Sequence, residues 1–175
     1  AVIDDCGVAV NPLNQLWNIT IPGGKPPVKP WPVPAENKPT LKILHLSDIH
    51  VDRNYLVGSE AECEAGHPFY EFCCINFPGE PVSEIKVPAG KWGMPYQCDI
   101  PYVTFETLIK GISEQQKVDY VYVTGDMEAH NIWDYTKEDT MANLNNISAV
   151  LHKYFPNTPI YEAVGNHEGV PMDAM

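Results

Sequence analysis

The stretch "DYVYVTGDMEAH", residues 119–130, joins a strand-like run to a cluster of polar side chains. The alternating tyrosine and valine residues predict a β-strand that ends at Gly125 and Asp126. His130 follows four positions after Asp126. Ligands of α/β proteins bind beyond the carboxyl ends of the strands, and this is where the carboxylate and the imidazole lie. The stretch therefore predicts a strand of an α/β sheet with a functional site at its end.

Two other segments have the same layout. The segment "LKILHLSDIH", residues 41–50, contains a strand-like run that ends in Asp48 and His50. The segment "PIYEAVGNHE", residues 159–168, ends in Asn166 and His167. Apolar residues on both faces of residues 41–48 predict a strand that is buried between two layers. Three such ends could converge at one edge of a single sheet.

Two helices are predicted between these strands. Residues 101–117 repeat apolar side chains at helical spacing, and residues 136–155 begin with Thr136 as an N-cap and Asp139 three positions on. The expected apolar stripe of the second helix consists of Met141, Leu144, Ile147, Leu151 and Tyr154. Strands that alternate with helices predict the α/β class. Residues 52–100 have little periodicity and are expected to be irregular.

The composition limits the class of protein. The 175 residues include 44% hydrophobic and 19% charged side chains, which is typical of a globular domain. A formal net charge of -12 argues against a nucleic-acid-binding protein, which normally has a basic face. No apolar run approaches the ~20 residues of a membrane span, so no transmembrane segment is predicted. The first residue is Ala1 and no signal peptide is visible, so we expect a processed product or a fragment.

The chain divides into three regions by composition. Residues 1–21 are short and ambiguous, and residues 22–40 are rich in proline. A proline-rich run forms neither helix nor central strand, so residues 22–40 are expected to be an extended linker. The globular domain is expected to comprise residues 41–175.

The five cysteines indicate an oxidising compartment. Four of them, Cys63, Cys73, Cys74 and Cys98, lie in the irregular segment, which favours disulfides. A zinc knot is the alternative, but no pair has the CxxC spacing of such knots. Cys6 is left over and suggests a partner outside this chain. With sequons at Asn18 and Asn146, the cysteines favour the secretory pathway.

The polar residues at the strand ends are of metal-binding types. Asp48 and His50 are two positions apart, so in extended backbone they would point the same way and hold one cation. Asp126 has two oxygens that could bridge two cations, and Asn166 offers a neutral oxygen. Mixed nitrogen and oxygen ligands suit zinc, iron or manganese. Two metals ~3.5–4 Å apart can clamp the attacking and leaving oxygens of a phosphoryl transfer. Each motif alone could be a plain turn or a helix cap.

The ordered motifs D-x-H, G-D and G-N-H resemble those of the calcineurin-like metallophosphoesterases. The stretches "HLSDIHVDRNYLVG", "CDIPYVTFETL", "VYVTGDMEAHNIWDYT" and "YEAVGNHEGVP" are more closely similar to the acid sphingomyelinase group of that superfamily. The resemblance covers about residues 41–171. It implies a four-layer α/β/β/α sandwich and hydrolysis of sphingomyelin to ceramide and phosphocholine in a lysosomal or extracellular fluid.

The resemblance also implies roles for individual residues. Two zinc ions would be held by Asp48 and His50, by Asp126 as the bridging carboxylate, and by Asn166. His130 and His167 match the two histidines beside the scissile phosphate.

The cysteines and the N-terminal part are included in the same resemblance. It implies the pairs Cys63–Cys73 and Cys74–Cys98. Residues 1–21 match the end of a saposin-like domain, and Cys6 would pair with a cysteine of that domain.

The sequence departs from the family pattern in one respect. The later Gly-His-x-His motif does not occur in these 175 residues, so the sandwich is expected to be incomplete and the chain alone weakly active or inactive. Two alternatives remain open at this point. One is a related phosphodiesterase that acts on nucleotides, and the other is a non-catalytic secreted binding protein.

Overall fold

The structure is a computed structural model that describes residues 20–174, apart from residues 21, 25, 34, 64–71 and 77–84. The chain divides into two compact units, Ala1–Pro39 and Thr40–Met175. In the first unit the described residues are exposed and form neither helix nor strand. Their role as a linker stays a prediction. The predictions for Cys6 and Asn18, and for all of residues 1–21 except Thr20, lie outside the described residues.

The second unit is built on a parallel sheet. It has the strand order β1-β4-β5, where β1 is Ile43–Leu46, β4 is Tyr120–Val123 and β5 is Ile160–Glu162. Both pairs are parallel. Two further short strands, β2 (Val51–Asp52) and β3 (Ile100–Pro101), form a separate parallel pair. The α/β class predicted from the sequence is confirmed, and the three predicted strands form one sheet.

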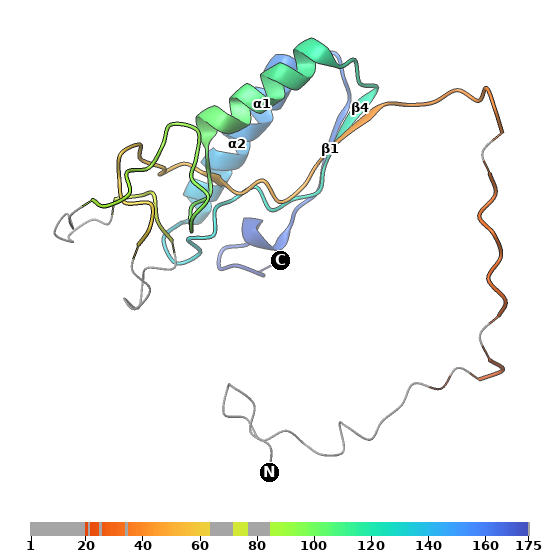
Figure 1. The fold of residues 1–175 in the computed structure, drawn as a ribbon, viewed down its shortest axis with the longest axis horizontal. Coiled ribbons are helices and arrows are strands. Elements are labelled where there is room, and N and C mark those ends of the chain that lie inside the picture. Colours follow the sequence, from red (N-terminus) through yellow and green to blue (C-terminus); the bar gives the residue numbers. More distant parts are fainter. Residues whose placement is uncertain are drawn as a thin grey trace. The chain divides into compact units, whose positions relative to one another are not determined.

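Two helices lie side by side along the sheet, α1 (Tyr102–Gln115) and α2 (Lys137–Tyr154) (Figure 1). The predicted N-terminus of α2 is confirmed. The Thr136 hydroxyl accepts from the Asp139 main-chain N–H at 3.2 Å, and the Asp139 carboxylate accepts from the Thr136 N–H at 3.0 Å. This capping box satisfies main-chain donors that an uncapped helix would leave unpaired. A local signal in the sequence was therefore sufficient to place the start of α2.

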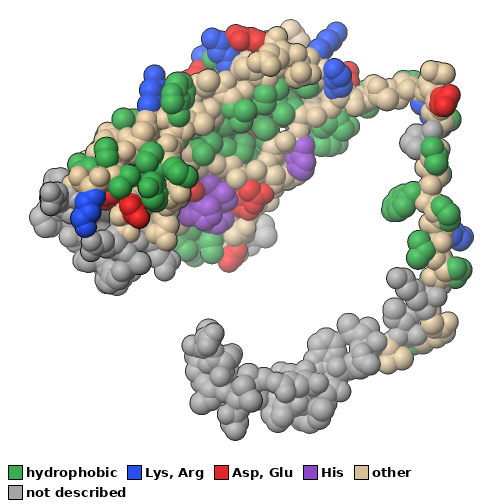
Figure 2. All heavy atoms as spheres, viewed as in Figure 1, with side chains coloured by type: hydrophobic (Ala, Val, Ile, Leu, Met, Phe, Trp, Pro, Cys, Tyr) green, Lys and Arg blue, Asp and Glu red, His purple; other side chains and the backbone are tan. Residues whose placement is uncertain are grey.

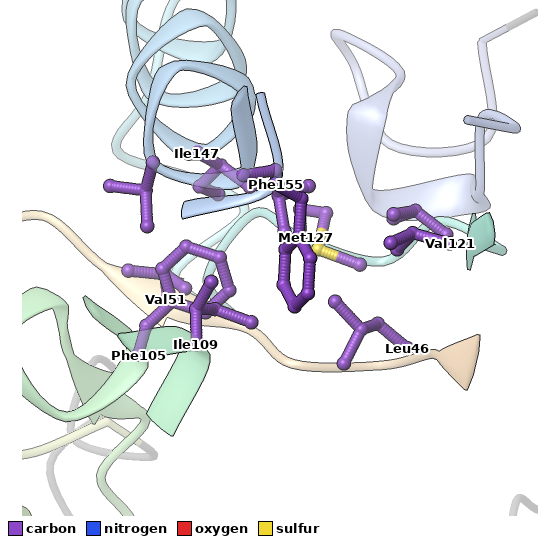
Figure 3. Packing of buried hydrophobic residues seen from close by; sticks show 11 residues of the cluster. Leu46, Val51, Phe105, Ile109, Val121, Met127, Ile147 and Phe155 are labelled. Carbon is purple, nitrogen blue, oxygen red and sulfur yellow. The ribbon is translucent and has the colours of Figure 1, made fainter. Parts of the chain in front are cut away.

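The hydrophobic core lies between the two helices and the sheet (Figure 3). Phe105 and Ile109 of α1 are fully buried and pack with Val121 of β4 and with Leu151 of α2. Leu46, Val51, Met127, Ile147 and Phe155 belong to the same cluster. The core therefore fixes the carboxyl ends of β1 and β4 against both helices, which is the edge that carries the polar clusters.

The buried face of α2 differs from the predicted stripe. Met141 is 57% exposed, whereas the buried residues are Thr140, Asn143, Ile147, Val150 and Leu151. Asn143 is buried because its amide donates to the main-chain oxygen of Val51 and to the carboxylate of Glu128, both at 3.3 Å. The prediction was wrong for Met141 because hydrophobicity alone cannot identify a polar side chain with buried partners.

In the described part of the chain, β1 is buried on one face only, so the predicted burial on both faces is not seen. Leu46 is buried, but Ile43 is 46% exposed and His45 is exposed. On the neighbouring strands Tyr122 and Tyr161 are 42% and 56% exposed, and their rings lie 5.7 Å apart. Within the described residues the helices cover one face of the sheet, and an aromatic face stays open. Among the described residues, no helix combines the length and the apolar character needed to cross a bilayer.

The irregular segment is held by two disulfides, Cys63–Cys73 and Cys74–Cys98. Disulfide bonding, favoured from the cysteine distribution, is confirmed, and these are the pairs that the family resemblance implies. Cys73 and Cys74 are buried. Since Cys98 directly precedes Asp99, the second disulfide anchors the start of β3 to the irregular segment.

Candidate functional site

The site is built on two loops that continue the pairing of β1 and β4 beyond their ends. The main-chain N–H of Asp48 donates to the oxygen of Gly125 at 3.1 Å, and that of His50 donates to the oxygen of Asp126 at 3.1 Å. These bonds align the two loops residue by residue. Parallel strands bring their carboxyl ends to one edge, so two motifs about 78 positions apart become neighbours.

Three polar residues of these loops have left-handed backbone. The φ angles are +54° for Asp48, +46° for His50 and +56° for Asp126. The expectation that Asp48 and His50 share an extended segment was wrong, because β1 already ends at Leu46. A left-handed backbone conformation costs a non-glycine residue about 1–3 kcal/mol of folding free energy. Such conformations cluster at functional sites.

The segment that follows β5 approaches the Asp126 loop closely at two glycines, Gly125 and Gly165. A Cβ atom on Gly125, which has a φ angle of +92°, would lie 2.6 Å from Cα of Gly165. A Cβ atom on Gly165 would lie 2.6 Å from the main-chain nitrogen of Asp126. Only glycine permits this approach of the two backbones. The contact brings the short 3-10 helix Asn166–Glu168, which follows β5, against the Asp126 loop.

Asp126 is the point where the three segments meet. Its Oδ1 accepts from the main-chain N–H of His167 at 3.0 Å. The end of the Asn166 amide that faces Asp126 lies 3.2 Å from both carboxylate oxygens; a nitrogen there would donate to them, and an oxygen there would share a cation with them. Candidate ligand atoms of Asp48, His50 and Asp126 all lie within 4.8 Å of one another. The structure thus brings together all four residues that the sequence suggested as metal ligands.

A histidine cluster adjoins this group. His50, His130 and His167 also have ring nitrogens within 4.8 Å of one another. Ring centroids are 3.9 Å apart for His50 and His130, and 4.7 Å for His50 and His167. Figure 2 shows a patch of histidine side chains with acidic side chains beside it on one face. His50 belongs to both groups and so connects the carboxylates with the two other histidines.

The donor set fits a cation. His50 Nδ1 lies 2.7 Å from the main-chain oxygen of Glu128, and a carbonyl only accepts, so Nδ1 carries the proton. Nε2 is then the nitrogen available to a metal, which is the usual state of a metal-binding histidine. Nδ1 of His167 is buried and has no hydrogen-bond partner in the described part of the chain. Carboxylate oxygens beside imidazole nitrogens suit zinc, manganese or iron.

The sequence alone did not identify Asp99 as a site residue. Its Oδ1 lies 2.8 Å from Nδ1 of His130, and its Oδ2 accepts from the main-chain N–H of His130 at 2.7 Å. The His130 side chain is 53% exposed, while that of Asp99 is 12% exposed. The two residues are 31 positions apart, so no periodic pattern connects them. Asp99 follows Cys98 and lies in the stretch "CDIPYVTFETL" that carries part of the family resemblance, and these were the available signals.

A buried ionic group lies behind the site. Arg53 Nη1 contacts Glu128 Oε1 at 2.7 Å, and Glu128 is fully buried. Burial raises the pKa of the Glu128 carboxyl, and the charge of Arg53 opposes this rise. Burial also raises the pKa of Asp52 to about 7, although the Asn54 main-chain N–H bonds to its carboxylate and opposes the rise. These groups support the loops and do not lie among the candidate ligands.

Other candidate residues lie away from the site. Asn146, in the second sequon, is exposed on α2, and its main-chain oxygen accepts from the hydroxyl of Tyr102 at 3.0 Å. His45 lies 3.0 Å from the Thr124 hydroxyl through its Nε2. These positions agree with a surface sequon and with a histidine that is hydrogen-bonded outside the site.

Comparison with known proteins gives a family and several relatives. The family model for calcineurin-like phosphoesterases matches residues 41–174. Sphingomyelin phosphodiesterase 2 of Caenorhabditis elegans is 53% identical over the whole chain, which covers 30% of that protein. The bovine sphingomyelin phosphodiesterase is 39% identical over 90% of the chain and 24% of its own length. The human sphingomyelin phosphodiesterase is 38% identical over 76% of the chain and 20% of its own length.

These similarities confirm the resemblance that the strand-end motifs indicated. The matched family region includes all of the candidate ligands and both further histidines. The chain spans less than a third of the length of these curated relatives.

Proposed function

The chain belongs to the calcineurin-like phosphoesterase family, and from this premise we propose that it forms part of a zinc-dependent phosphodiesterase that hydrolyses sphingomyelin to ceramide and phosphocholine. The observation that carries the proposal is the convergence at one sheet edge of Asp48, His50 and Asp126, whose ligand atoms lie within 4.8 Å of one another. The names of the relatives in the worm, in cattle and in humans support the substrate.

In this proposal, Asp48, His50, Asp126 and Asn166 would hold the zinc ions. Bound metals of this kind polarise a phosphoryl oxygen and offset the charge that develops during displacement at phosphorus. Glu128 orients His50 through its main-chain oxygen, so that Nε2 is directed to ligation. Asn166 adds an oxygen ligand without adding negative charge.

His130 and His167 act on the substrate phosphate. Asp99 accepts a hydrogen bond from Nδ1 of His130, so in the doubly protonated imidazolium it is Nε2 that carries the proton transferred to the departing oxygen. Ceramide leaves as an alcohol, whose alkoxide is a poor leaving group without that proton. The exposed His130 side chain is accessible to a substrate from solvent. His167 contributes a second imidazole beside the same phosphate.

The remaining architecture follows the family. The open face of the β1-β4-β5 sheet is where a second sheet would pack in a four-layer α/β/β/α sandwich, because parallel sheets are normally covered on both faces. Residues 1–21 form the end of a saposin-like domain in this proposal, and residues 22–40 connect it to the catalytic domain at residues 41–175. Cys6 pairs with a cysteine of the saposin-like domain.

The compartment follows from the chemistry of the chain. Two disulfides support an oxidising environment, in keeping with a secreted or lysosomal enzyme. Asn18 and Asn146 are the proposed glycosylation sites.

The role of His130 as general acid is tested by comparing two substrates whose leaving groups differ in their need for a proton. We expect the full-length gene product to contain zinc and to hydrolyse both sphingomyelin and bis-nitrophenyl phosphate. Because nitrophenolate leaves without a proton, His130→Ala should reduce turnover of sphingomyelin far more than turnover of the nitrophenyl ester. His152→Ala, on the exposed side of α2, is the matched control. Equal losses on the two substrates would contradict the role of His130.

Assays of the same purified protein also distinguish the proposal from a nucleotide phosphodiesterase and from a non-catalytic binding protein. Hydrolysis of nucleotide phosphodiesters in place of sphingomyelin would identify the nucleotide-specific alternative. A folded protein that contains no metal and hydrolyses neither substrate would indicate a binding protein and would overturn the proposal.

A further inference from the structure

The carboxylate of Glu168 accepts hydrogen bonds from four main-chain N–H groups. Oε2 accepts from Gly165 at 2.6 Å and from Asp126 at 2.9 Å. Oε1 accepts from Met127 at 2.6 Å and from Glu128 at 3.3 Å. One of these donors belongs to the segment of Glu168 itself, while the other three belong to the loop after β4, about 40 positions earlier. Through these hydrogen bonds, Glu168 joins two segments that lie far apart in the sequence.

The three donors of the β4 loop are consecutive, from Asp126 to Glu128. Successive N–H groups point towards one side in a turn or where right-handed and left-handed residues adjoin, and they then form a concave site for an anion. Gly125 and Asp126 have φ angles of +92° and +56°. The carboxylate of Glu168 occupies this concave site. Its charge strengthens each hydrogen bond, because bonds to an ionised acceptor are about twice as strong as neutral ones.

A further hydrogen bond runs in the opposite direction between the same segments. The carboxylate of Asp126 accepts from the main-chain N–H of His167 at 3.0 Å. Each segment thus uses a carboxylate to hold the backbone of the other. The side-chain direction of Asp126 depends on the peptide unit that Glu168 holds, since Asp126 has a costly left-handed backbone.

We propose that Glu168 is a positioning residue that holds Asp126 in its ligating conformation and fixes the Asn166–His167 turn against it. The inference rests on the metal site proposed above. Glu168 is absent from the two groups of candidate ligands among the described residues, so its role is to orient other groups. The four donors need two oxygens that each accept two hydrogen bonds, and a carboxylate supplies both oxygens whereas a neutral amide supplies one.

Replacement by glutamine keeps the size of the side chain and removes one acceptor. In either orientation of the Gln amide, two of the four N–H groups would face an NH2 group. The matched control is Glu162→Gln, which makes the same charge change at an exposed position of β5 in the same region. The full-length gene product is loaded with zinc for affinity measurements and with cobalt for its visible absorption spectrum.

We expect Glu168→Gln to weaken zinc binding by roughly 10–100-fold, the usual effect of losing an outer-shell partner. The cobalt spectrum should change because the ligand geometry changes, kcat should fall with KM nearly constant, and excess zinc should restore part of kcat. A residue that only stabilised the fold would lower the melting temperature of the metal-free protein and leave the cobalt spectrum of the folded protein unchanged. That second result would overturn the inference.

The experiment also distinguishes a variant that does not fold from an inference that is wrong, and an error in the metal site from an error in the role of Glu168. If Glu168→Gln does not fold, Glu168→Asp keeps the charge but is one methylene too short to reach all four donors, and its cobalt spectrum decides in the same way. If the unmodified protein binds no metal, the proposed metal site and this inference are both wrong. If it binds metal and both Glu168 variants match it in affinity and spectrum, only the inference is wrong.

Discussion

Asp99 holds His130 by two contacts, one to the imidazole Nδ1 at 2.8 Å and one to the main-chain N–H at 2.7 Å. The contacts fix both the position of the loop and the rotation of the ring. Because Asp99 directly follows the disulfide-bonded Cys98, the irregular segment that precedes β3 contributes to a site otherwise formed at the sheet edge. The position of His130 therefore depends both on the disulfide-bonded segment, through Asp99, and on the sheet edge.

Replacement of Asp99 by asparagine should lower kcat for sphingomyelin with little change in KM. The amide cannot accept as strongly from Nδ1, so the tautomer and ring orientation of His130 are no longer fixed. A positioned general acid contributes about 10²–10⁴-fold, and the loss should approach the lower part of that range. Steady-state kinetics measure it, with the exposed Asp134→Asn as the control. Unchanged kcat in Asp99→Asn would remove Asp99 from the mechanism.

The close approach of Gly125 and Gly165 predicts an unequal response of two glycines to alanine. Gly58 and Gly125 both have positive φ angles, +88° and +92°, but a Cβ atom on Gly58 meets no atom within 4 Å. Gly58→Ala should cost about 1–2 kcal/mol from the backbone alone. Gly125→Ala should cost more and abolish metal binding, because its Cβ atom would displace the turn that carries Asn166. Denaturant unfolding and zinc content measure the two effects. Similar losses in both variants would contradict the steric argument.

The core predicts a large effect of truncating α1 at Ile109. Ile109 is fully buried, so Ile109→Ala should lower the free energy of unfolding by about 2–5 kcal/mol. The neighbouring Leu108 is 48% exposed, and Leu108→Ala should change stability by only about 0.5 kcal/mol. Urea denaturation followed by circular dichroism measures both. Equal destabilisation would mean that α1 packs through a different face.

The contact between α1 and α2 predicts a pH-dependent contribution to stability. Glu106 Oε1 accepts from Lys153 Nζ at 2.7 Å and from the Tyr154 hydroxyl at 3.0 Å. Those hydrogen bonds from Lys153 and Tyr154 lower the pKa of Glu106 below its usual value of 4.5. A carboxyl whose pKa is lower in the folded state stabilises the fold above pH 4.5, and this contribution is lost as the pH falls through the folded pKa.

Glu106→Gln should therefore lower the melting temperature slightly at pH 7, and the difference from the unmodified protein should vanish in strongly acidic buffer. Melting temperatures of both proteins, measured from pH 7 down to the strongly acidic buffer, test this expectation. In the double variant with Lys153→Gln the two losses should not add, since both remove the same contact. A difference that stayed constant with pH would exclude this carboxyl as the cause.

Local sequence patterns predicted the parts of the fold that depend on near neighbours. The capping box of Thr136 and Asp139 involves residues three positions apart, and the strand-end motifs follow directly from short β-prone runs. The buried face of α2 was predicted less well. Met141 is exposed and Asn143 is buried, because Asn143 bonds to Glu128 and Val51 from distant segments.

The sequence by itself determined which residue types stand at the strand ends, since the polar residues follow each β-prone run directly in the chain. Tertiary structure decided which of those residues meet and what holds them. Glu168 finds three of its donors about 40 positions away, and Asp99 finds His130 31 positions away. The bonds of Glu168 depend on the parallel alignment of β4 and β5, whereas Asp99 stands directly before β3 of the β2-β3 pair, and no periodicity along the chain encodes either contact.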